Sequence, residues 1–201
     1  AAGPDAIVVP KVDSAEAVLR LADSLDRFGA PDKTTLWAMV ETPIAMLHCE
    51  HIAAASPRLS VLVMGTNDLA KELYAEHVPG RQPLLTGLGL CLLAARATGK
   101  AILDGVYNDV RNLEGFLAEC QQGREMGFDG KTLIHPGQVE GANSTFAPSE
   151  QAVADALGIV AAWEEGKDRG VVTYNGKMIE NLHVATAERV LAIHEAITSL
   201  A

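Results

Sequence analysis

The stretch LSVLVMGTNDLA, residues 59–70, joins a buried strand to the beginning of a helix and places an acid between them. Its first seven residues are nearly all apolar, which is typical of a strand inside a sheet. Thr66, Asn67 and Asp68 then interrupt the apolar run before helix-forming residues resume. The stretch therefore predicts a strand-to-helix unit with Asp68 at the carboxyl end of its strand.

The same alternation of strand and helix continues on both sides of this unit. Four further strand-like runs are predicted at residues 6–10, 35–41, 101–106 and 131–136. Helical periodicity follows the first three runs, and a turn or short helix follows the last. Strands alternating with helices indicate an α/β fold with parallel pairing and right-handed crossovers.

The composition of the chain changes after Phe146. The remaining residues predict a capped helix, a small hairpin around Asn175 and Gly176, and a last helix over residues 182–200. We therefore expect two parts, residues 1–146 with the strand–helix units and residues 147–201 as an appendage.

Charge and composition exclude several classes of function. The 201 residues carry a formal net charge of -10 and no run rich in Lys or Arg, which argues against a nucleic-acid surface. No apolar stretch is long enough to span a membrane, and the first residues do not resemble a signal peptide. Three cysteines without CxxC spacing favour a cytoplasmic protein. The start without Met, directly before a strand, suggests that an N-terminal portion has been lost or removed.

Two acids follow neighbouring predicted strands. Glu41 and Asp68 would lie side by side, because the carboxyl ends of parallel strands face the same side. Unpartnered carboxylates would repel each other, and Mg²⁺ suits one or two carboxylates together with water and substrate oxygens. Alternatively, Asp68 or Asn67 caps a helix and Glu41 is a solvated strand end. The spacing alone leaves both interpretations open.

Six motifs occur in the order typical of one family of enzymes. They are VVPKV at residues 8–12, VETP at 40–43, GTNDLA at 65–70, ILDGVYND at 102–109, GFDGKTLIHPGQV at 127–139 and MIENLHVATA at 178–187. The chain resembles the HpcH/HpaI aldolase and citrate lyase β-subunit family, especially its branch of malyl-CoA lyases and malyl-CoA thioesterases. The resemblance implies a (β/α)8 TIM barrel with a C-terminal helical lid, Mg²⁺ on the catalytic face, and CoA thioesters of hydroxy acids as substrates. Only the later barrel strands have counterparts here. The family's first strands and its substrate-gripping arginine have none before Ala1.

The resemblance assigns roles to three acids. It places the family's metal-binding carboxylates at Glu41 and Asp68. The family's lid motif, usually Met-Ile-Asp, carries an acid/base residue that reaches a neighbouring subunit. Here that position is Glu180, which is one methylene longer and would alter the reach of the carboxylate. Such a change could move the chemistry from carbon–carbon cleavage to thioester hydrolysis.

Five other residues are candidates with open alternatives. Lys11 meets either a substrate carboxylate or CoA phosphate, or an internal ion pair. Thr66 and Asn67 are expected to bind substrate beside the metal. His135 lies near the CoA moiety by resemblance, although a hydrogen-bonded turn histidine is the simpler interpretation. Asp104 is expected to act in catalysis by positioning a water or loop, and a capping role is equally compatible with its place.

The resemblance implies a Mg²⁺-dependent CoA ester lyase that cleaves malyl-CoA, β-methylmalyl-CoA or citryl-CoA to an acyl-CoA and an α-keto acid. One alternative is a (3S)-malyl-CoA thioesterase. Another is a non-catalytic CoA-binding or subunit-assembly module. The family also implies a homotrimer or homohexamer that exchanges lids between subunits, with no nucleic-acid or membrane partner.

Overall fold

The chain forms two compact units in a computed structural model that describes residues 3–167 and 171–200. The first unit is Ala1–Phe146 and the second is Ala147–Ala201. Each unit has its own hydrophobic core, and each is described by itself below. Their predicted roles as part of a barrel and as a lid stay predictions.

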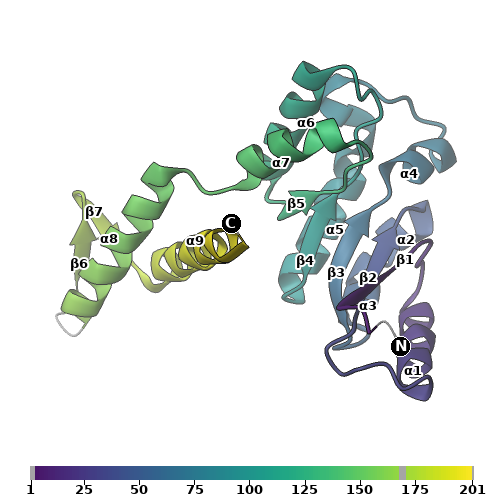
Figure 1. Ribbon diagram of the computed structural model, residues 1–201, viewed down its shortest axis with the longest axis horizontal. Coiled ribbons are helices and arrows are strands. Elements are labelled where there is room, and N and C mark those ends of the chain that lie inside the picture. The colour runs from purple at the N-terminus through teal and green to yellow at the C-terminus, as the bar shows by residue number, and fades with distance from the viewer. Residues whose placement is uncertain (1–2, 168–170, 201) are drawn as a thin grey trace. The chain divides into compact units, whose positions relative to one another are not determined.

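The first unit is built on a parallel sheet whose five strands lie in sequence order (Figure 1). Every pair of neighbouring strands is parallel. This arrangement confirms the predicted α/β fold with a parallel sheet. The strands are β1 (Ala6–Val9), β2 (Thr35–Val40), β3 (Leu59–Met64), β4 (Ala101–Asp104) and β5 (Gly130–Lys131).

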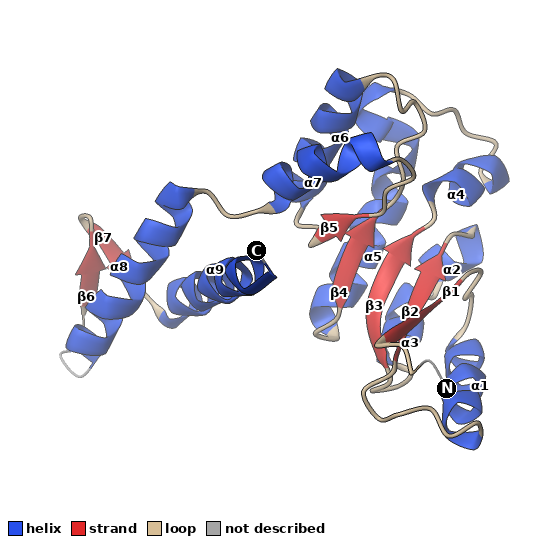
Figure 2. Cartoon of the chain, viewed as in Figure 1, coloured by secondary structure: helices blue, strands red, loops and turns tan. Residues whose placement is uncertain are grey.

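The strands are joined by helices, as expected for parallel pairing (Figure 2). The hydroxyl of Thr42 accepts a hydrogen bond from the nitrogen of Ala45, and Pro43 occupies the first helical position behind it. The helices of this unit are α1 (Ala15–Arg27), α2 (Pro43–Leu47), α3 (Cys49–Ala54), α4 (Thr66–Glu72), the 3-10 helix η1 (Pro79–Leu84), α5 (Leu85–Ala97), α6 (Leu113–Met126), the 3-10 helix η2 (Pro136–Gln138) and α7 (Val139–Phe146).

The core of the first unit lies between the sheet and the helices on one of its faces. Alternate residues of β2 are buried, whereas those between them are only half-buried. The buried set packs with Val18 of α1, Ile52 of α3 and Leu88 of α5. Each such side chain contributes about 1.5–3 kcal/mol by leaving water. The packing holds the strands in register, so their carboxyl ends meet at one edge.

The fifth strand is shorter than residues 131–136, the range predicted for it. It ends at Lys131 because the chain turns away from β4 soon afterwards. The nitrogen of Ile134 donates to the side chain of Gln138 at 3.2 Å, and η2 begins directly after His135. Among the described residues, β1 and β5 each pair with a single strand. A closed (β/α)8 barrel is therefore not present within this part of the chain.

The second unit combines two helices with a small hairpin. Helix α8 (Glu150–Gly166) precedes strands β6 (Val172–Tyr174) and β7 (Lys177–Ile179), and α9 (Asn181–Leu200) follows them. The strands pair antiparallel, and Asn175 and Gly176 have positive φ of 47° and 73°, as a two-residue hairpin turn requires. The predicted hairpin is confirmed. No helix within residues 3–167 or 171–200 is long and apolar enough to cross a bilayer.

Candidate metal and substrate site

Glu41 and Asp68 come from neighbouring strand ends, as predicted. Val40 of β2 is paired with Met64 of β3, and the nitrogen of Gly65 donates to the carbonyl of Val40 at 3.0 Å. Glu41 follows β2 directly, and Asp68 lies in the first turn of α4. Pairing of β2 with β3 therefore determines how the two acids are placed.

Gly65 is the residue that lets Glu41 fit against the next strand. A methyl group added at Gly65 would overlap the side chain of Glu41. Glu41 is itself only 4% exposed, so it has little room to move aside. The glycine is therefore required by close approach between the two strand ends.

Lys11 contacts both acids through different atoms. Its backbone nitrogen donates to Glu41 Oε1 at 2.8 Å, in a left-handed conformation with φ of 53°. Its Nζ lies 3.0 Å from Asp68 Oδ1 and 3.9 Å from Glu72 Oε1. Lys11 thus makes an ion pair, but a solvent-exposed one, whereas the predicted alternative was an internal ion pair. Its contact with substrate stays a prediction.

The pKa shifts at Glu41 and Lys11 reflect the burial of Glu41 beside Asp68. Burial raises the pKa of the Glu41 carboxyl, the hydrogen bond from Lys11 opposes this shift, and the charge of Asp68 adds to it. The hydrogen bond to Asp68 raises the pKa of the Lys11 ammonium. Negative charge is therefore concentrated here, and a cation already lies against it.

The two carboxylates suit Mg²⁺, which keeps several waters, better than a metal ion whose ligands all come from the protein. Among the described residues, no group of three or more His, Cys, Asp or Glu side chains is arranged to hold a metal ion. Glu41 and Asp68 supply two carboxylates, and Mg²⁺ is commonly bound by one or two carboxylates while keeping several waters. The Lys11 ammonium beside Asp68 indicates that this position attracts positive charge.

Thr66 and Asn67 follow β3 in the chain, and each of them contacts a residue that follows β4. Thr66 is buried, and its side chain lies so close to Gly105 that a methyl group there would overlap it. The amides of Asn67 and Asn108 exchange two hydrogen bonds of 2.9 and 2.7 Å, and both residues are exposed. The predicted substrate-binding residues thus lie beside Asp68 in the chain. Contact with a substrate stays a prediction for both.

Asp104 occupies the strand end that was predicted, but its side chain has structural partners. It is 0% exposed and accepts two hydrogen bonds from Arg81 Nη1, at 2.7 and 2.8 Å, and one from Lys131 Nζ at 3.1 Å. It shares the face of β4 with Ile102, which packs in the core. This arrangement favours a role in holding η1 and β5 over the catalytic role expected from its position.

The ion pairs around Asp104 include residues that the sequence did not single out. Lys131 also contacts Glu119 of α6 at 2.7 Å, and Arg81 Nε donates to Gln122 at 2.8 Å. Lys131 ends its strand, in register with Asp104, whereas the strand predicted over residues 131–136 would begin there. An arginine directly after Pro79-Gly80, just before the apolar helix Leu85–Ala97, was the available signal for this network. A cavity of about 420 Å³ adjoins Arg81.

His135 and Glu180 have local hydrogen bonds. The Nδ1 atom of His135 accepts from the nitrogen of Gly137 at 3.0 Å and caps η2, so the turn-histidine interpretation is confirmed. In the second unit, the backbone nitrogen of Glu180 donates to Nδ1 of His183 at 2.9 Å at the start of α9. Glu180 is exposed. The substrate-binding role of His135 and the acid/base role of Glu180 stay predictions.

Two family models match the chain. The model described as HpcH/HpaI aldolase/citrate lyase matches residues 1–136. The model described as C-C_Bond_Lyase of the TIM-Barrel fold matches residues 86–196. Together they cover both units.

Curated relatives give the same result. The chain is 52% identical over 197 residues to a (3S)-malyl-CoA thioesterase of Cereibacter sphaeroides strain ATCC 17025. It is 35% identical over 202 residues to citrate lyase subunit beta of Leuconostoc mesenteroides subsp. cremoris. Both matches cover 97% of this chain and 67% of the relative.

A solved structure is also similar. The protein CitE from Mycobacterium tuberculosis, in complex with magnesium, acetoacetate and coenzyme A, matches with a TM-score of 0.73 and 28% identity. The match covers 94% of this chain and 67% of that one. These similarities confirm the resemblance drawn from the motifs: the chain belongs to the HpcH/HpaI aldolase/citrate lyase family.

Proposed function

We propose that the full-length protein is a Mg²⁺-dependent thioesterase that hydrolyses (3S)-malyl-CoA. The carboxylate pair Glu41 and Asp68 carries this proposal, because two carboxylates at the edge of the sheet where parallel α/β folds bind ligands would hold a cation there. The choice of reaction is supported by 52% identity to proteins named (3S)-malyl-CoA thioesterase. This support favours the thioesterase alternative over the lyase that the sequence put first.

Glu41 and Asp68 are the residues that would hold Mg²⁺. The ion would supply a Lewis acid that polarises an oxygen of the substrate. Lys11 lies at Asp68 with a half-exposed side chain, so its ammonium can turn to a carboxylate or phosphate of the substrate. Thr66, Asn67 and His135 are proposed to bind the rest of the acyl-CoA.

Glu180 is proposed as the acid/base group, contributed by the second unit of a neighbouring subunit. In hydrolysis, its carboxylate would take a proton from the water that attacks the thioester carbonyl. The carbon–sulfur bond then breaks, and the proton passes to the departing CoA thiolate. The assembly is proposed to be a homotrimer or homohexamer with exchanged lids.

Carbon–carbon cleavage is the second candidate. Its support is the 35% identity to a citrate lyase β subunit and the match to a family model described as a carbon–carbon bond lyase. In this reaction the bond between the hydroxyl-bearing carbon and the α-carbon of the thioester breaks. The hydroxyl loses its proton to solvent as the carbonyl of the α-keto acid forms, and Glu180 would then donate a proton to that α-carbon of the released acyl-CoA.

One assay distinguishes the two reactions. The full-length protein is incubated with (3S)-malyl-CoA and Mg²⁺, and free CoA and glyoxylate are followed separately, with EDTA as control. We expect malate and free CoA to form without glyoxylate. EDTA should abolish the formation of malate and free CoA. Glyoxylate with acetyl-CoA would replace the thioesterase with the lyase. If neither free CoA nor glyoxylate forms, both the thioesterase and the lyase proposals are wrong.

Subunit exchange has its own test. A variant with Glu41→Gln and a variant with Glu180→Gln are each expected to be inactive alone. If Glu180 acts on a neighbouring subunit, mixed assemblies regain part of the activity, because some sites combine an intact Glu41 with an intact Glu180. Failure of mixed assemblies that are shown to form would place both residues in sites of one subunit.

A further inference from the structure

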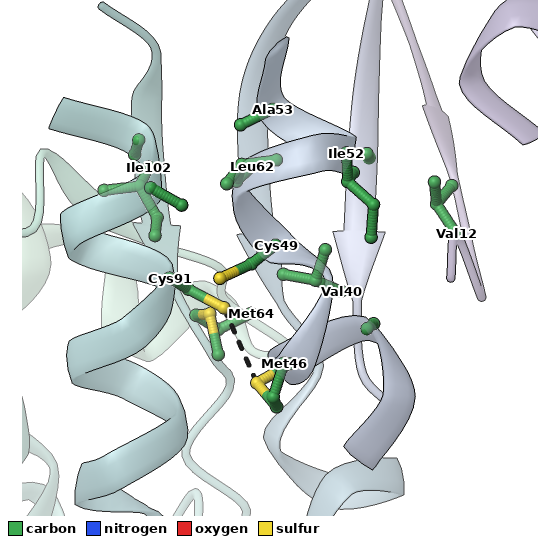
Figure 3. Close-up of a cluster of buried hydrophobic side chains, with 14 of the residues drawn as sticks. Val12, Val40, Met46, Cys49, Ile52, Ala53, Leu62, Met64, Cys91 and Ile102 are labelled. Carbon is green, nitrogen blue, oxygen red and sulfur yellow. Dashed lines mark hydrogen bonds between the residues drawn. The ribbon is translucent and has the colours of Figure 1, made fainter. Parts of the chain in front are cut away.

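Two of the three cysteines converge in the core, although they are far apart in the sequence. Cys49 lies on α3 and Cys91 on α5, and their side chains point toward one another (Figure 3). Cys49 Sγ lies 3.4 Å from the carbonyl of Leu90, the residue directly before Cys91. Cys91 Sγ lies 3.5 Å from Met46 Sδ. We call Cys49 and Cys91 the thiol pair.

The helices that carry the thiol pair are held in place by the same core. Ile52 of α3 and Leu88 of α5 are both fully buried and belong to the main core cluster. Cys49 and Cys91 belong to that cluster too. Because close packing restricts side-chain movement, the two sulfur atoms remain neighbours.

We propose that Cys49 and Cys91 form a reversible disulfide when the protein is exposed to hydrogen peroxide. This modification is independent of the proposed activity, since neither cysteine belongs to the metal or substrate site. It would join α3 to α5 covalently. The sequence alone, with scattered cysteines and no CxxC motif, gave no indication of it.

The two thiols have different chemical roles. The neighbouring Cys91 thiol lowers the pKa of the Cys49 thiol, although burial opposes the shift. The same interaction and burial raise the pKa of Cys91. Because the thiolate is the nucleophile, Cys49 is the sulfur that reacts with peroxide first.

Access to the pair also favours Cys49. It is 5% exposed and borders an open depression of about 330 Å³, which Met46 and Leu90 also line. Cys91 is 0% exposed and does not line this depression. Peroxide can therefore approach Cys49 after a small movement of the depression's lining, while Cys91 stays protected.

The reaction balances in two steps. The Cys49 thiolate attacks one oxygen of hydrogen peroxide, the oxygen–oxygen bond breaks, and the products are a sulfenic acid and hydroxide, which takes up a proton to form water. The Cys91 sulfur then attacks the Cys49 sulfur, gives up its proton, and a second water leaves. Overall, two thiols lose two electrons and two protons, and peroxide is reduced to two waters.

Cys120 provides a matched control within the chain. It is also 0% exposed, but burial raises its pKa to about 11, and it lies on α6 in a separate cluster with Phe116 and Ala142. It should therefore react slowly and should not pair with either member of the thiol pair.

The test is peptide mapping of the full-length protein after mild peroxide treatment, with free thiols blocked by alkylation. We expect a linked peptide pair joining Cys49 to Cys91, lighter by two hydrogen atoms and separated again by dithiothreitol. Cys120→Ala should leave this product unchanged, and Cys49→Ala should abolish it. Because mapping of the unaltered protein already identifies the bond, the test does not depend on the variants folding.

Four outcomes would overturn the proposal. One is conversion of Cys49 to sulfinic or sulfonic acid without a link to Cys91. Two others are a linked peptide that contains Cys120 and a link that forms only between two molecules. A folded protein with both thiols still free after prolonged exposure to peroxide would equally contradict it.

Discussion

The backbone nitrogen of Lys11 lies 2.8 Å from Glu41 Oε1, so replacing the Lys11 side chain by any residue except proline leaves the donor of this bond in place. The ammonium of the same residue contacts Asp68. The two interactions can therefore be separated by experiment, because a change of side chain at Lys11 affects the contact with Asp68 alone.

Replacing Lys11 by Met should strengthen Mg²⁺ binding several-fold in the absence of substrate. The ammonium competes with a metal ion for Asp68, and its removal leaves the carboxylate free. Calorimetric titration with Mg²⁺ would measure the change, and KM for malyl-CoA should rise if Lys11 also binds substrate. Weaker Mg²⁺ binding in this variant would show that Lys11 supports the metal site instead of competing for it.

Replacing Glu41 by Gln should abolish Mg²⁺-dependent turnover. Loss of a metal ligand should reduce activity by more than the roughly 10–100-fold that loss of an outer-shell partner costs. Glu72→Gln is the matched control, because Glu72 lies 3.9 Å from Lys11 Nζ but is not proposed to hold the metal. Equal losses in both variants would argue for a general charge effect and against a specific ligand.

A methyl group at Gly65 should damage both stability and metal binding. Gly65→Ala would overlap Glu41, and overpacking of this kind costs about 1–3 kcal/mol. Gly89→Ala is the control, because a methyl group there meets nothing within 4 Å and α5 gains up to about 1 kcal/mol in helix propensity. Thermal unfolding should therefore shift in opposite directions for the two variants, and a shift in the same direction would refute the predicted overlap.

Asp104→Asn should destabilise the first unit strongly. The change removes the buried carboxylate that contacts both Arg81 and Lys131 and leaves them Glu119 as their remaining shared acid, and breaking a buried ion pair costs about 3–5 kcal/mol. Asp5→Asn is the comparison, because the Asp5 pair with Lys33 is solvent-exposed and its loss should not be measurable. Urea unfolding of the Asp104→Asn and Asp5→Asn variants would measure the change in the free energy of unfolding for each. A folded, stable Asp104→Asn protein without activity would restore the catalytic role.

Mg²⁺ affinity should rise with pH from the ordinary carboxyl range upward. Without metal, the native pKa of Glu41 lies above its ordinary value of 4.5, so its contribution to stability is complete below 4.5 and is lost as pH rises through the native pKa. Mg²⁺ requires the ionised form and must displace the proton. Titrations at several pH values would measure this dependence. In the Glu41→Gln variant the side chain at position 41 cannot ionise, so its Mg²⁺ affinity should depend less on pH.

The parallel pairing of the strands and the Glu41–Asp68 pair could be predicted from the sequence. The pair depends on a general property of parallel sheets, that carboxyl ends of strands share one edge. The acid at each strand end was therefore enough to bring these two side chains together, and the identity of Gly65 as a residue of close approach agrees with that placement.

The ion-pair partners of Asp104 could not be predicted from the sequence, and its catalytic role stays a prediction. A residue at a strand end faces one of two sides, and the sequence did not reveal that Arg81 and Lys131 occupy the side that Asp104 faces. Long-range partners of this kind depend on tertiary packing, as does the approach of Cys49 to Cys91. The fifth strand is shorter than predicted because the nitrogen of Ile134 donates to the side chain of Gln138 and not to a neighbouring strand.

The paired amides of Asn67 and Asn108 have a consequence for the whole edge of the sheet. Unlike the contacts around Asp68, this link involves no net charge and no titratable group. Acid, salt and the arrival of a divalent ion should therefore leave it unchanged. The loops after β3 and β4 can keep their spacing while the charges next to them are being rearranged.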